Sequence, residues 1–364
     1  MIRVDEIYNN VLWAWLNKHN KNSRLFYCDP PGTSEPSNLF NHGSDYIKET
    51  DYIFLHDQEP IHMDVHKELF DDVIRRNKDI SPTPRGNVIV SEKNSDFLEK
   101  LENSYGWKSH YYFYHGWASL DWYRGYNRTF LIPRARDRSP SKTFISPNRI
   151  IGGKRDHRVL FMYHVFKNGL EDNYITVPKI CPEENIDIRT IAKKYSAVYP
   201  DIVNTFNDSE LPYLFDGEET QIMSSCWITN FDESADSLFY VPTETVYFEK
   251  RLHLTEKTFK PIALEMPFIL VAPHGSLEYL RSYGFKSFSG IIDESYDEET
   301  NDIKRIEKIG KLLKDIDNMS TADKQKIHKQ CLPIVEHNYN HFYHGGFEDI
   351  LWSELSNMMR GFNA

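Results

Sequence analysis

Apolar residues in the first third of the chain form short runs, and the stretches between these runs have helical spacing. The runs predict strands at residues 24–28, 52–55, 87–91 and 108–114. Residues 65–77 and 96–104 carry apolar side chains at the spacing of amphipathic helices. This alternation of strand and helix predicts an α/β unit of the doubly wound kind.

The same alternation returns in the second part of the chain. Residues 143–146 predict a strand, and the continuous apolar run at 267–272 predicts a strand that is buried on both faces. A short helix capped by Ser276 is expected over residues 276–283, and the second apolar run at 285–292 predicts a further strand. These features predict a second doubly wound unit, so the fold class is α/β with two such domains.

Helices dominate the last part of the chain. The spacing of apolar residues predicts amphipathic helices over residues 301–316 and 347–358. A further helix is expected from Thr321 towards Glu336, with a kink or break at Pro333 because proline removes a backbone donor.

One stretch has the composition of a linker. Residues 132–141, Ile-Pro-Arg-Ala-Arg-Asp-Arg-Ser-Pro-Ser, combine proline, serine and charge. We place the domain boundary there, which gives an N-terminal domain at 1–135, a C-terminal domain at 142–335 and a final helix at 336–364.

Composition indicates an ordered protein of the cell interior. The chain has 364 residues, of which 40% are hydrophobic, enough for a substantial core. Its four cysteines form no CxxC pair, which favours a reducing cytoplasm over a disulfide framework or a zinc site. No apolar stretch approaches the ~20 residues that cross a bilayer, and the acidic start does not resemble a signal peptide. We expect a cytoplasmic protein with no membrane span.

Charge is unevenly distributed along the chain. The formal net charge of -11 argues against indiscriminate nucleic-acid binding. Against this background stands a basic block consisting of Arg124, Arg128, Arg134, Arg136, Arg138, Lys142, Arg149, Lys154, Arg155 and Arg158. Only Asp137 and Asp156 oppose it, so we expect a bound anion nearby, either a diphosphate or a second polyanion.

The run at residues 253–262, His-Leu-Thr-Glu-Lys-Thr-Phe-Lys-Pro-Ile, suits an anionic ligand. Thr255 is a good helix N-cap, and the donors after it favour a phosphate. Lys257 adds positive charge, while the Glu256 carboxylate can accept from hydroxyls. Pro261 predicts an irregular turn before a short helix. The alternative is a capped surface helix with solvated charges.

A second candidate phosphate site is the loop that follows the strand at residues 143–146. It contains Gly152-Gly153 and several cations, and the helix after it is ended by Gly169. Asp156 is expected to cap that helix. The two glycines do not make a GxGxxG fingerprint, so the loop alone is a weak signal.

Several of these stretches together resemble a family of GT-B glycosyltransferase-like proteins of bacteria and tailed bacteriophages. The stretches are Thr-Glu-Lys-Thr-Phe-Lys-Pro-Ile at 255–262, Pro-Phe-Ile-Leu-Val-Ala at 267–272, Gly-Ser-Leu-Glu-Tyr-Leu-Arg at 275–281 and Gly-Phe-Lys-Ser-Phe at 284–288. Phe-Ile-Ser-Pro-Asn-Arg at 144–149 and the segment 157–170 also resemble the family. The resemblance covers roughly residues 140–300 well and the first 130 residues poorly.

The resemblance implies a GT-B fold of two Rossmann-like domains, with C-terminal helices packing back toward the first. Its Glu-Lys element is similar to that of fucosyltransferases, which grips the nucleotide-sugar donor. By this likeness Glu256 would bind ribose or sugar hydroxyls, with Glu244 close by. Lys257 and Arg149 would stabilise the diphosphate leaving group. The remaining donor-site candidates are Thr255, Lys154, Arg155 and Arg158.

Metal dependence and cofactors are not expected. GT-B enzymes usually stabilise the leaving group with protein cations and helix N-termini. Asp315-Ile-Asp317 has the spacing of a metal-binding DxD, but carboxylates at i and i+2 on a helix diverge. The only small molecule implied is the nucleotide sugar, which leaves as a nucleoside diphosphate.

Candidates for a general base follow the predicted strand at residues 52–55. His56, Asp57 and Glu59 stand at what should be the ligand-facing end of the first unit. The alternative is a turn ended by Pro60 with its own capping acid. A retaining mechanism would need no such base, and the sequence leaves inversion and retention open.

The acceptor is the most open question. A dense aromatic cluster includes Trp117 and Trp122, directly before Arg124; core packing explains most of it, while stacking on an acceptor is the alternative. The acceptor could be a glycan, or DNA if the chain is a bacteriophage enzyme that glycosylates 5-hydroxymethylated pyrimidines in the host cytoplasm. In a different class, the chain would be a non-catalytic nucleotide-sugar-binding protein.

Overall fold

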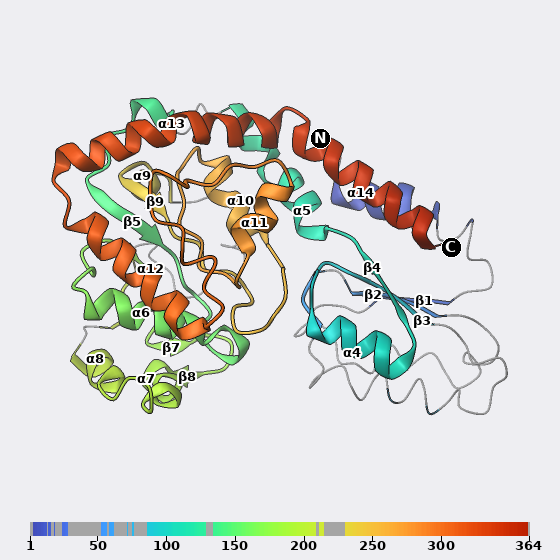
Figure 1. Ribbon diagram of the computed structural model, residues 1–364, viewed down its shortest axis with the longest axis horizontal. Coiled ribbons are helices and arrows are strands. Elements are labelled where there is room, and N and C mark those ends of the chain that lie inside the picture. The colour runs from blue at the N-terminus through green and yellow to red at the C-terminus, as the bar shows by residue number, and fades with distance from the viewer. Residues whose placement is uncertain are drawn as a thin grey trace. The chain divides into compact units, whose positions relative to one another are not determined.

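The computed structural model describes residues 3–12, 14, 15, 18, 24–27, 52–56, 58–61, 71, 75, 86–128, 134–208, 211–214 and 230–362. The chain falls into two units, which are described separately (Figure 1). The first comprises Met1–Asp121, Glu249–His253 and Glu348–Ala364, and the second comprises Trp122–Phe248 and Leu254–Phe347. The predicted linker at residues 132–141 lies inside the second unit.

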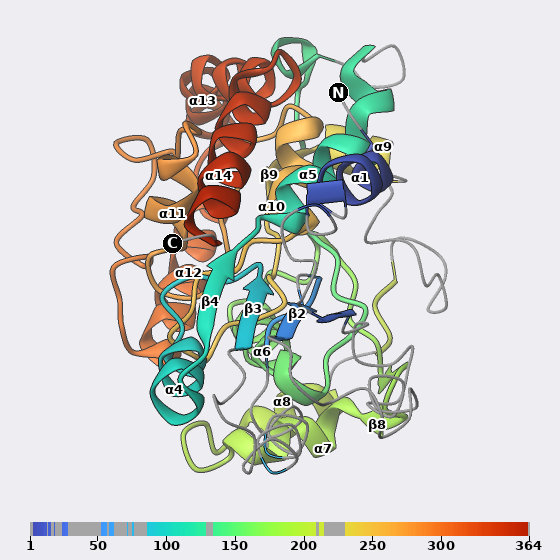
Figure 2. The ribbon, with the colours of Figure 1, turned by 90° about the vertical axis from the view of Figure 1, so that its right-hand side faces the viewer.

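A parallel sheet organises the first unit. Its strands are β1 (Arg24–Tyr27), β2 (Tyr52–His56), β3 (Gly86–Val90) and β4 (Lys108–Tyr111), in the order β1-β2-β3-β4. Strands β2, β3 and β4 lie side by side in Figure 2. Ile53 pairs with Asn87 and Val88 with Ser109. All four strands were predicted from apolar runs and are confirmed, except that β4 ends at Tyr111 and not at Tyr114, where a helix begins.

The helix between β3 and β4 is also confirmed. α4 spans Asp96–Tyr105; the Ser95 hydroxyl accepts from the amide of Phe97, and Gly106 ends the helix with a φ of 65°. The helix predicted at residues 65–77 lies largely outside the described residues, although Asp71 and Arg75 are helical.

The C-terminal helix packs within the first unit. This helix is α14 (Gly346–Phe362). The other helical segments that contribute here are α1 (Val4–Glu6), a π-helical turn (Ile7–Leu12) and α5 (Tyr114–Tyr123). The rings of Trp117 and Trp352 meet edge to face at 4.8 Å. Glu354, two residues after Trp352, also binds within this unit: one of its carboxylate oxygens lies 2.5 Å from the Lys93 ammonium.

A smaller parallel sheet organises the second unit. β5 (Lys142–Ser146) lies between β6 (Tyr174–Ile175) and β9 (Ser237–Tyr240). The chain therefore steps from β5 to one neighbour and later returns to the other side of β5. In open α/β sheets, ligands bind beyond the carboxyl ends of strands at such a reversal of strand order.

Helices make up most of the remaining regular structure described in the second unit. They are α6 (His157–Lys167), α7 (Ile188–Ala192), α8 (Ile202–Asp208), α9 (Phe231–Ala235), α10 (Glu256–Ala263), α11 (Ser276–Ser282), α12 (Asp302–Asp317) and α13 (Thr321–Tyr343), with a hairpin of β7 (Ile180–Cys181) and β8 (Ile186–Asp187). α12 and α6 lie side by side (Figure 1). A Cβ at Gly310 of α12 would come within 2.8 Å of His164 Cβ, so glycine permits this close approach.

Two helices run through prolines that were expected to interrupt them. α10 includes Pro261, so the irregular turn predicted there is wrong. α13 likewise continues through Pro333 to Tyr343 without the predicted break, and residue 336 falls inside it. Each proline removes one amide donor from a helix that tertiary packing holds, and α10 and α13 pack on each other.

The apolar segments after α10 form less regular structure than predicted. The run at residues 267–272 lies parallel to the chain after β9, through isolated bridges from Tyr240 to Phe268 and from Thr243 to Val271. The run at 285–292 was predicted as a strand, which is wrong: it makes turns and one isolated bridge. Its phenylalanines are buried without a neighbouring strand to pair with.

The structure is a mixed α/β protein with small parallel sheets. Among the described strands of the first unit the order is sequential, without the reversal that defines a doubly wound sheet. Two Rossmann-like domains therefore stay a prediction. Within the part of the chain that is described, no helix is long and apolar enough to cross a membrane.

Candidate functional site

Hydrogen bonds close the carboxyl edge of the second sheet. The Ser146 hydroxyl, at the end of β5, donates to the carbonyl of Val241, just beyond β9. The Asn148 amide donates to the Ser146 hydroxyl at 3.1 Å, and the Thr243 hydroxyl donates to the Asn148 side-chain oxygen at 2.6 Å. The segments that leave the two strands are thus held together at the reversal of strand order.

Glu244 follows directly and is completely buried. Its carboxylate accepts from the amides of Thr245 at 3.3 Å and Thr255 at 3.0 Å. It also accepts from the hydroxyls of Thr255 at 2.6 Å and Thr258 at 2.5 Å. These four donors offset the cost of burying a carboxylate. Glu244 was predicted to bind the donor; the geometry instead makes it the anion at the start of α10.

Thr255 is the N-cap of α10, as predicted, because its hydroxyl accepts from the amide of Lys257. The Lys257 ammonium lies 2.6 Å from the Glu256 carboxylate, 3.3 Å from the Thr255 hydroxyl and 3.4 Å from the Thr245 hydroxyl. The Lys257 side chain is 25% exposed and that of Glu256 is 5% exposed. This places an accessible ammonium beside a carboxylate at the first turn of α10.

Arg158 is buried and binds three main-chain carbonyls. Its guanidinium donates to Ile150 at 2.7 Å, to Thr243 at 3.1 Å and to Glu244 at 3.3 Å. Burial, reinforced by the nearby charge of Arg155, lowers the pKa of Arg158 to about 9. The predicted role of Arg158 in contacting a donor has no support in this geometry, because the residue is only 4% exposed.

His157 binds one of the same carbonyls. Its Nε2 lies 3.1 Å from the carbonyl of Glu244, so Nε2 carries the proton, and its ring stacks on Tyr247 at 5.0 Å. Burial, with a smaller effect from the charge of Arg158, lowers the pKa of His157 well below its usual value. The histidine is therefore neutral at pH 7.

Acidic side chains already occupy the glycine loop. Gly153 has a φ of 59°, and a Cβ at Gly152 would come within 2.2 Å of the Glu184 carboxylate. The Arg155 guanidinium lies 3.7 Å from Glu183. A phosphate in this loop would have to displace these carboxylates, so the loop supports anion binding less well than its composition suggested.

The other predicted cations of this loop differ in exposure. Arg149 is half-buried, whereas Lys154 is exposed. The Asp156 side chain makes no capping hydrogen bond to α6; the prediction was wrong because Lys194 binds its carboxylate at 3.2 Å. Gly169, with a φ of 64°, follows the end of α6 as expected.

Much of the basic block is engaged inside the second unit. Arg134 pairs with Glu265 at 2.6 Å. Arg138 donates to the carbonyls of Leu264 and Glu265, and burial lowers its pKa to about 10. Because Arg138 and Arg158 both bind main chain, fewer cations remain to face a polyanion than the sequence indicated.

The structure describes only part of the predicted catalytic and acceptor groups. Asp57 lies outside the described residues, His56 is the last residue of β2, and Glu59 is half-buried in the turn that follows. Trp117 is buried against Trp352, which is the core-packing alternative. In the second unit, Trp122 and Arg124 are half-buried.

An ion pair at the carboxyl edge of the first sheet was not predicted. Glu92 follows β3, and its carboxylate accepts from Arg251 at 3.0 Å, with both side chains completely buried. Burial raises the pKa of Glu92, and the charge of Arg251 opposes this. The two residues are 159 positions apart, so no local pattern could have joined them.

Two histidines meet at the same edge. His115 Nε2 lies 2.7 Å from the carbonyl of Gln58, and His253 Nδ1 lies 2.9 Å from the carbonyl of Ser91. Their rings contact edge to face at 5.3 Å. Each carbonyl contact assigns the proton to one ring nitrogen, so both rings are held in a defined tautomer.

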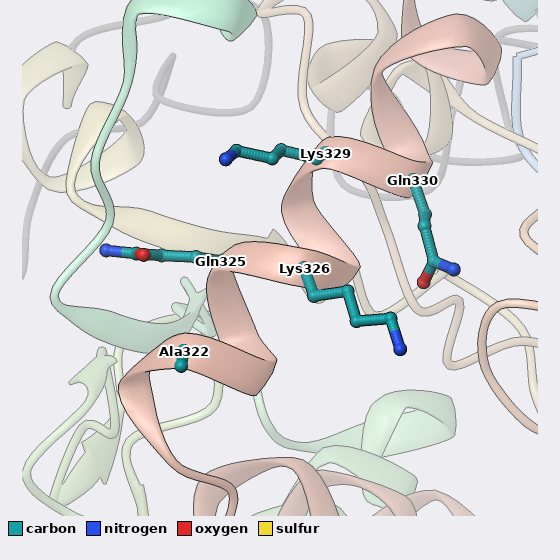
Figure 3. Close-up of a pocket in the computed structure, with 5 residues that line it drawn as sticks. All are labelled: Ala322, Gln325, Lys326, Lys329 and Gln330. Atoms are coloured by element: carbon teal, nitrogen blue, oxygen red, sulfur yellow. The ribbon is translucent and has the colours of Figure 1, made fainter.

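Metal-ligating groups and surface hollows could each mark a binding site. Among the described residues, no group of three or more histidine, cysteine or acidic side chains could hold a metal ion. A hollow of about 400 Å³ lies on α13 and is lined by Ala322, Gln325, Lys326, Lys329 and Gln330. Figure 3 shows these side chains extending in different directions from one helix, so they do not converge on a ligand.

No family model, curated protein or solved structure matches the chain. The likeness of its motifs to GT-B glycosyltransferases therefore rests on the sequence stretches themselves.

Proposed function

We propose that the chain is a glycosyltransferase whose second unit binds the diphosphate of a nucleotide sugar beside Lys257. The observation that supports this most is the contact between Lys257 and Glu256 at the first turn of α10. That turn is tied through Glu244 to the segment that leaves β9, where the strand order reverses. This is the position at which α/β sheets bind ligands.

The two side chains suit the two halves of such a donor. The Lys257 ammonium would contact the diphosphate and stabilise the charge that develops as the nucleoside diphosphate leaves. The Glu256 carboxylate would accept from a hydroxyl of the ribose or the sugar once the ligand has taken over Lys257. Because the Glu244 carboxylate already lies at the start of α10, the ligand's charge would be offset mainly by Lys257 rather than by the helix dipole.

The acceptor would supply a hydroxyl, whose oxygen attacks the anomeric carbon while its proton passes to a base. His56, Asp57 and Glu59 stay the candidates for that base. DNA as acceptor is the less favoured version, because Arg134, Arg138 and Arg158 are bonded within the unit. A glycan acceptor requires no cationic surface.

Calorimetry with uridine and guanosine diphosphates tests the donor site. Lys257→Ala removes a charge-assisted contact of about 1.5–3 kcal/mol, so affinity should fall by roughly 10- to 150-fold. Lys329→Ala, which removes an exposed lysine of α13, is the matched control and should bind like the unmodified protein.

Two results would contradict the proposal. One is an affinity for every nucleoside diphosphate that is the same in Lys257→Ala as in the unmodified protein. The other is nucleotide binding without release of nucleoside diphosphate from any nucleotide sugar in the presence of glycan or hydroxymethylated DNA, which would favour a non-catalytic binding protein.

Activity that is lost in EDTA and restored by manganese would contradict the metal-independent mechanism.

A further inference from the structure

Glu244 connects the start of α6 with the start of α10 in the second unit. Its carbonyl is held by His157 and Arg158 at the start of α6. Its carboxylate is held by Thr255 and Thr258 at the start of α10. Since the residue is completely buried, it cannot touch a ligand in this arrangement, yet it fixes the turn that carries Lys257.

Glu244 acts on Lys257 through the hydroxyl of Thr255, because it fixes the direction in which that hydroxyl donates. The Thr255 hydroxyl has a single proton, and it gives that proton to the Glu244 carboxylate at 2.6 Å. Only acceptor positions remain on the hydroxyl oxygen. These face the amide and the ammonium of Lys257, at 3.4 Å and 3.3 Å. The carboxylate of Glu244 thereby makes the Thr255 oxygen an obligatory acceptor for Lys257.

We propose that Glu244 is a positioning residue that holds the Lys257 ammonium in place for an anionic ligand by fixing the proton of the Thr255 hydroxyl. The proposal rests on the proposed function only in naming the ligand as a diphosphate; the positioning of Lys257 is independent of it. A purely structural Glu244 would affect the stability of the unit but would leave the environment of the Lys257 amine unchanged in a folded variant.

Glu244→Gln separates the two roles. The side chain keeps its shape, but its amide group can donate to the Thr255 oxygen and turn the hydroxyl proton toward Lys257. The ammonium then loses an acceptor and faces a donor. We expect the affinity for uridine or guanosine diphosphate to fall about tenfold, the effect of losing one such contact.

Amine labelling of the full chain, read by mass spectrometry, tests the positioning without any nucleotide. Lys257 should react at least about threefold faster in Glu244→Gln, with exposed Lys329 as the internal reference. Thr143→Val is the matched control. Thr143 is as buried as Thr255, and its hydroxyl donates to the Asp317 carboxylate at 2.6 Å elsewhere in this unit. It should lower stability and leave the labelling of Lys257 unchanged.

The outcomes separate the two proposals. Absence of nucleotide binding by the unmodified protein defeats the proposed function, while the labelling still decides the role of Glu244. Unchanged labelling of Lys257 in folded Glu244→Gln overturns the positioning role. If that variant does not fold, two replacements of Thr255 decide the question. Thr255→Val should speed the labelling of Lys257, whereas Thr255→Ser, which keeps the hydroxyl, should not. Equal labelling rates in these two variants would also overturn the proposal.

Discussion

His157 illustrates how single buried residues set the chemistry of the second unit. It donates through Nε2 to the carbonyl of Glu244 and stacks on Tyr247, in a place from which water is excluded. Burial therefore lowers its pKa well below 6.5, the ordinary value. The folded protein keeps this ring neutral at a pH where the unfolded chain would already protonate it.

This difference predicts acid sensitivity. Because the pKa is lowered in the folded state, the unfolded chain binds the proton first as the pH falls. The contribution to stability is intact above pH 6.5 and is lost below it, at about 1.4 kcal/mol per pH unit for one proton. His157→Gln should unfold in urea with a correspondingly shallower dependence on pH between 6.5 and 5.

The control for this measurement is His344→Gln, which replaces an exposed histidine of the same unit. It should keep the pH dependence of the unmodified protein. A pH dependence in His157→Gln that equals that of the unmodified protein would show that the imidazole is protonated in the folded state as readily as in the unfolded chain.

At the scale of elements, α11 shows that a helix can be capped from far along the chain. The sequence suggested Ser276 as its cap, but the hydroxyl of Ser276 bonds to the carbonyl of Pro273. Both carboxylate oxygens of Asp297 instead accept from the amide of Leu277, each at 3.1 Å. Burial raises the pKa of Asp297, so the ionised form carries a desolvation cost that these bonds offset only in part.

Replacements of Asp297 should therefore have opposite consequences. Asp297→Ala removes the cap and should lower the free energy of unfolding by about 1–2 kcal/mol. Asp297→Asn keeps an acceptor and removes the buried charge, so its stability at pH 7 should equal or exceed that of the unmodified protein. Thermal unfolding at pH 7 compares the two. An equal loss in both variants would mean that the charge itself holds α11.

The elements predicted correctly are those whose signals are local. The strands of the first unit come from apolar runs, and Thr255 is recognisable as a cap from its position before α10. The interpretation of Glu244 was incomplete because its donors lie in a different element, which no periodicity reveals. Helix α10 was predicted to be irregular because the effect of Pro261 was judged without the packing that compensates for it.

At the scale of the whole chain, the first unit is assembled from three segments. The short segment Glu249–His253 joins it through backbone bonds between Leu252 and Lys93, at 3.0 Å and 2.8 Å. Arg251 anchors the segment by its buried pair with Glu92, with its guanidinium over the ring of Phe97 at 4.4 Å. Five residues that lie far from the rest of the first unit in sequence are thus part of the core of that unit.

The anchor predicts a large effect on the first unit. Arg251→Met leaves the Glu92 carboxylate buried without its counter-charge and should cost about 3–5 kcal/mol. The double variant with Glu92→Leu should recover most of that loss, since the unpaired charge is gone. Hydrogen exchange at β3 measures the effect, with the amides of β5 as an internal reference. Unchanged protection of β3 in Arg251→Met would exclude the ion pair as an anchor.

The order in which these segments occur along the chain has a consequence for biosynthesis. The second unit has all of its residues once the ribosome has added Phe347. The first unit, most of which precedes the second unit along the chain, still lacks Glu348–Ala364 and with it the partners of Trp117 and Lys93. The usual sequence of events, in which the part synthesised first is finished first, is therefore reversed in this protein.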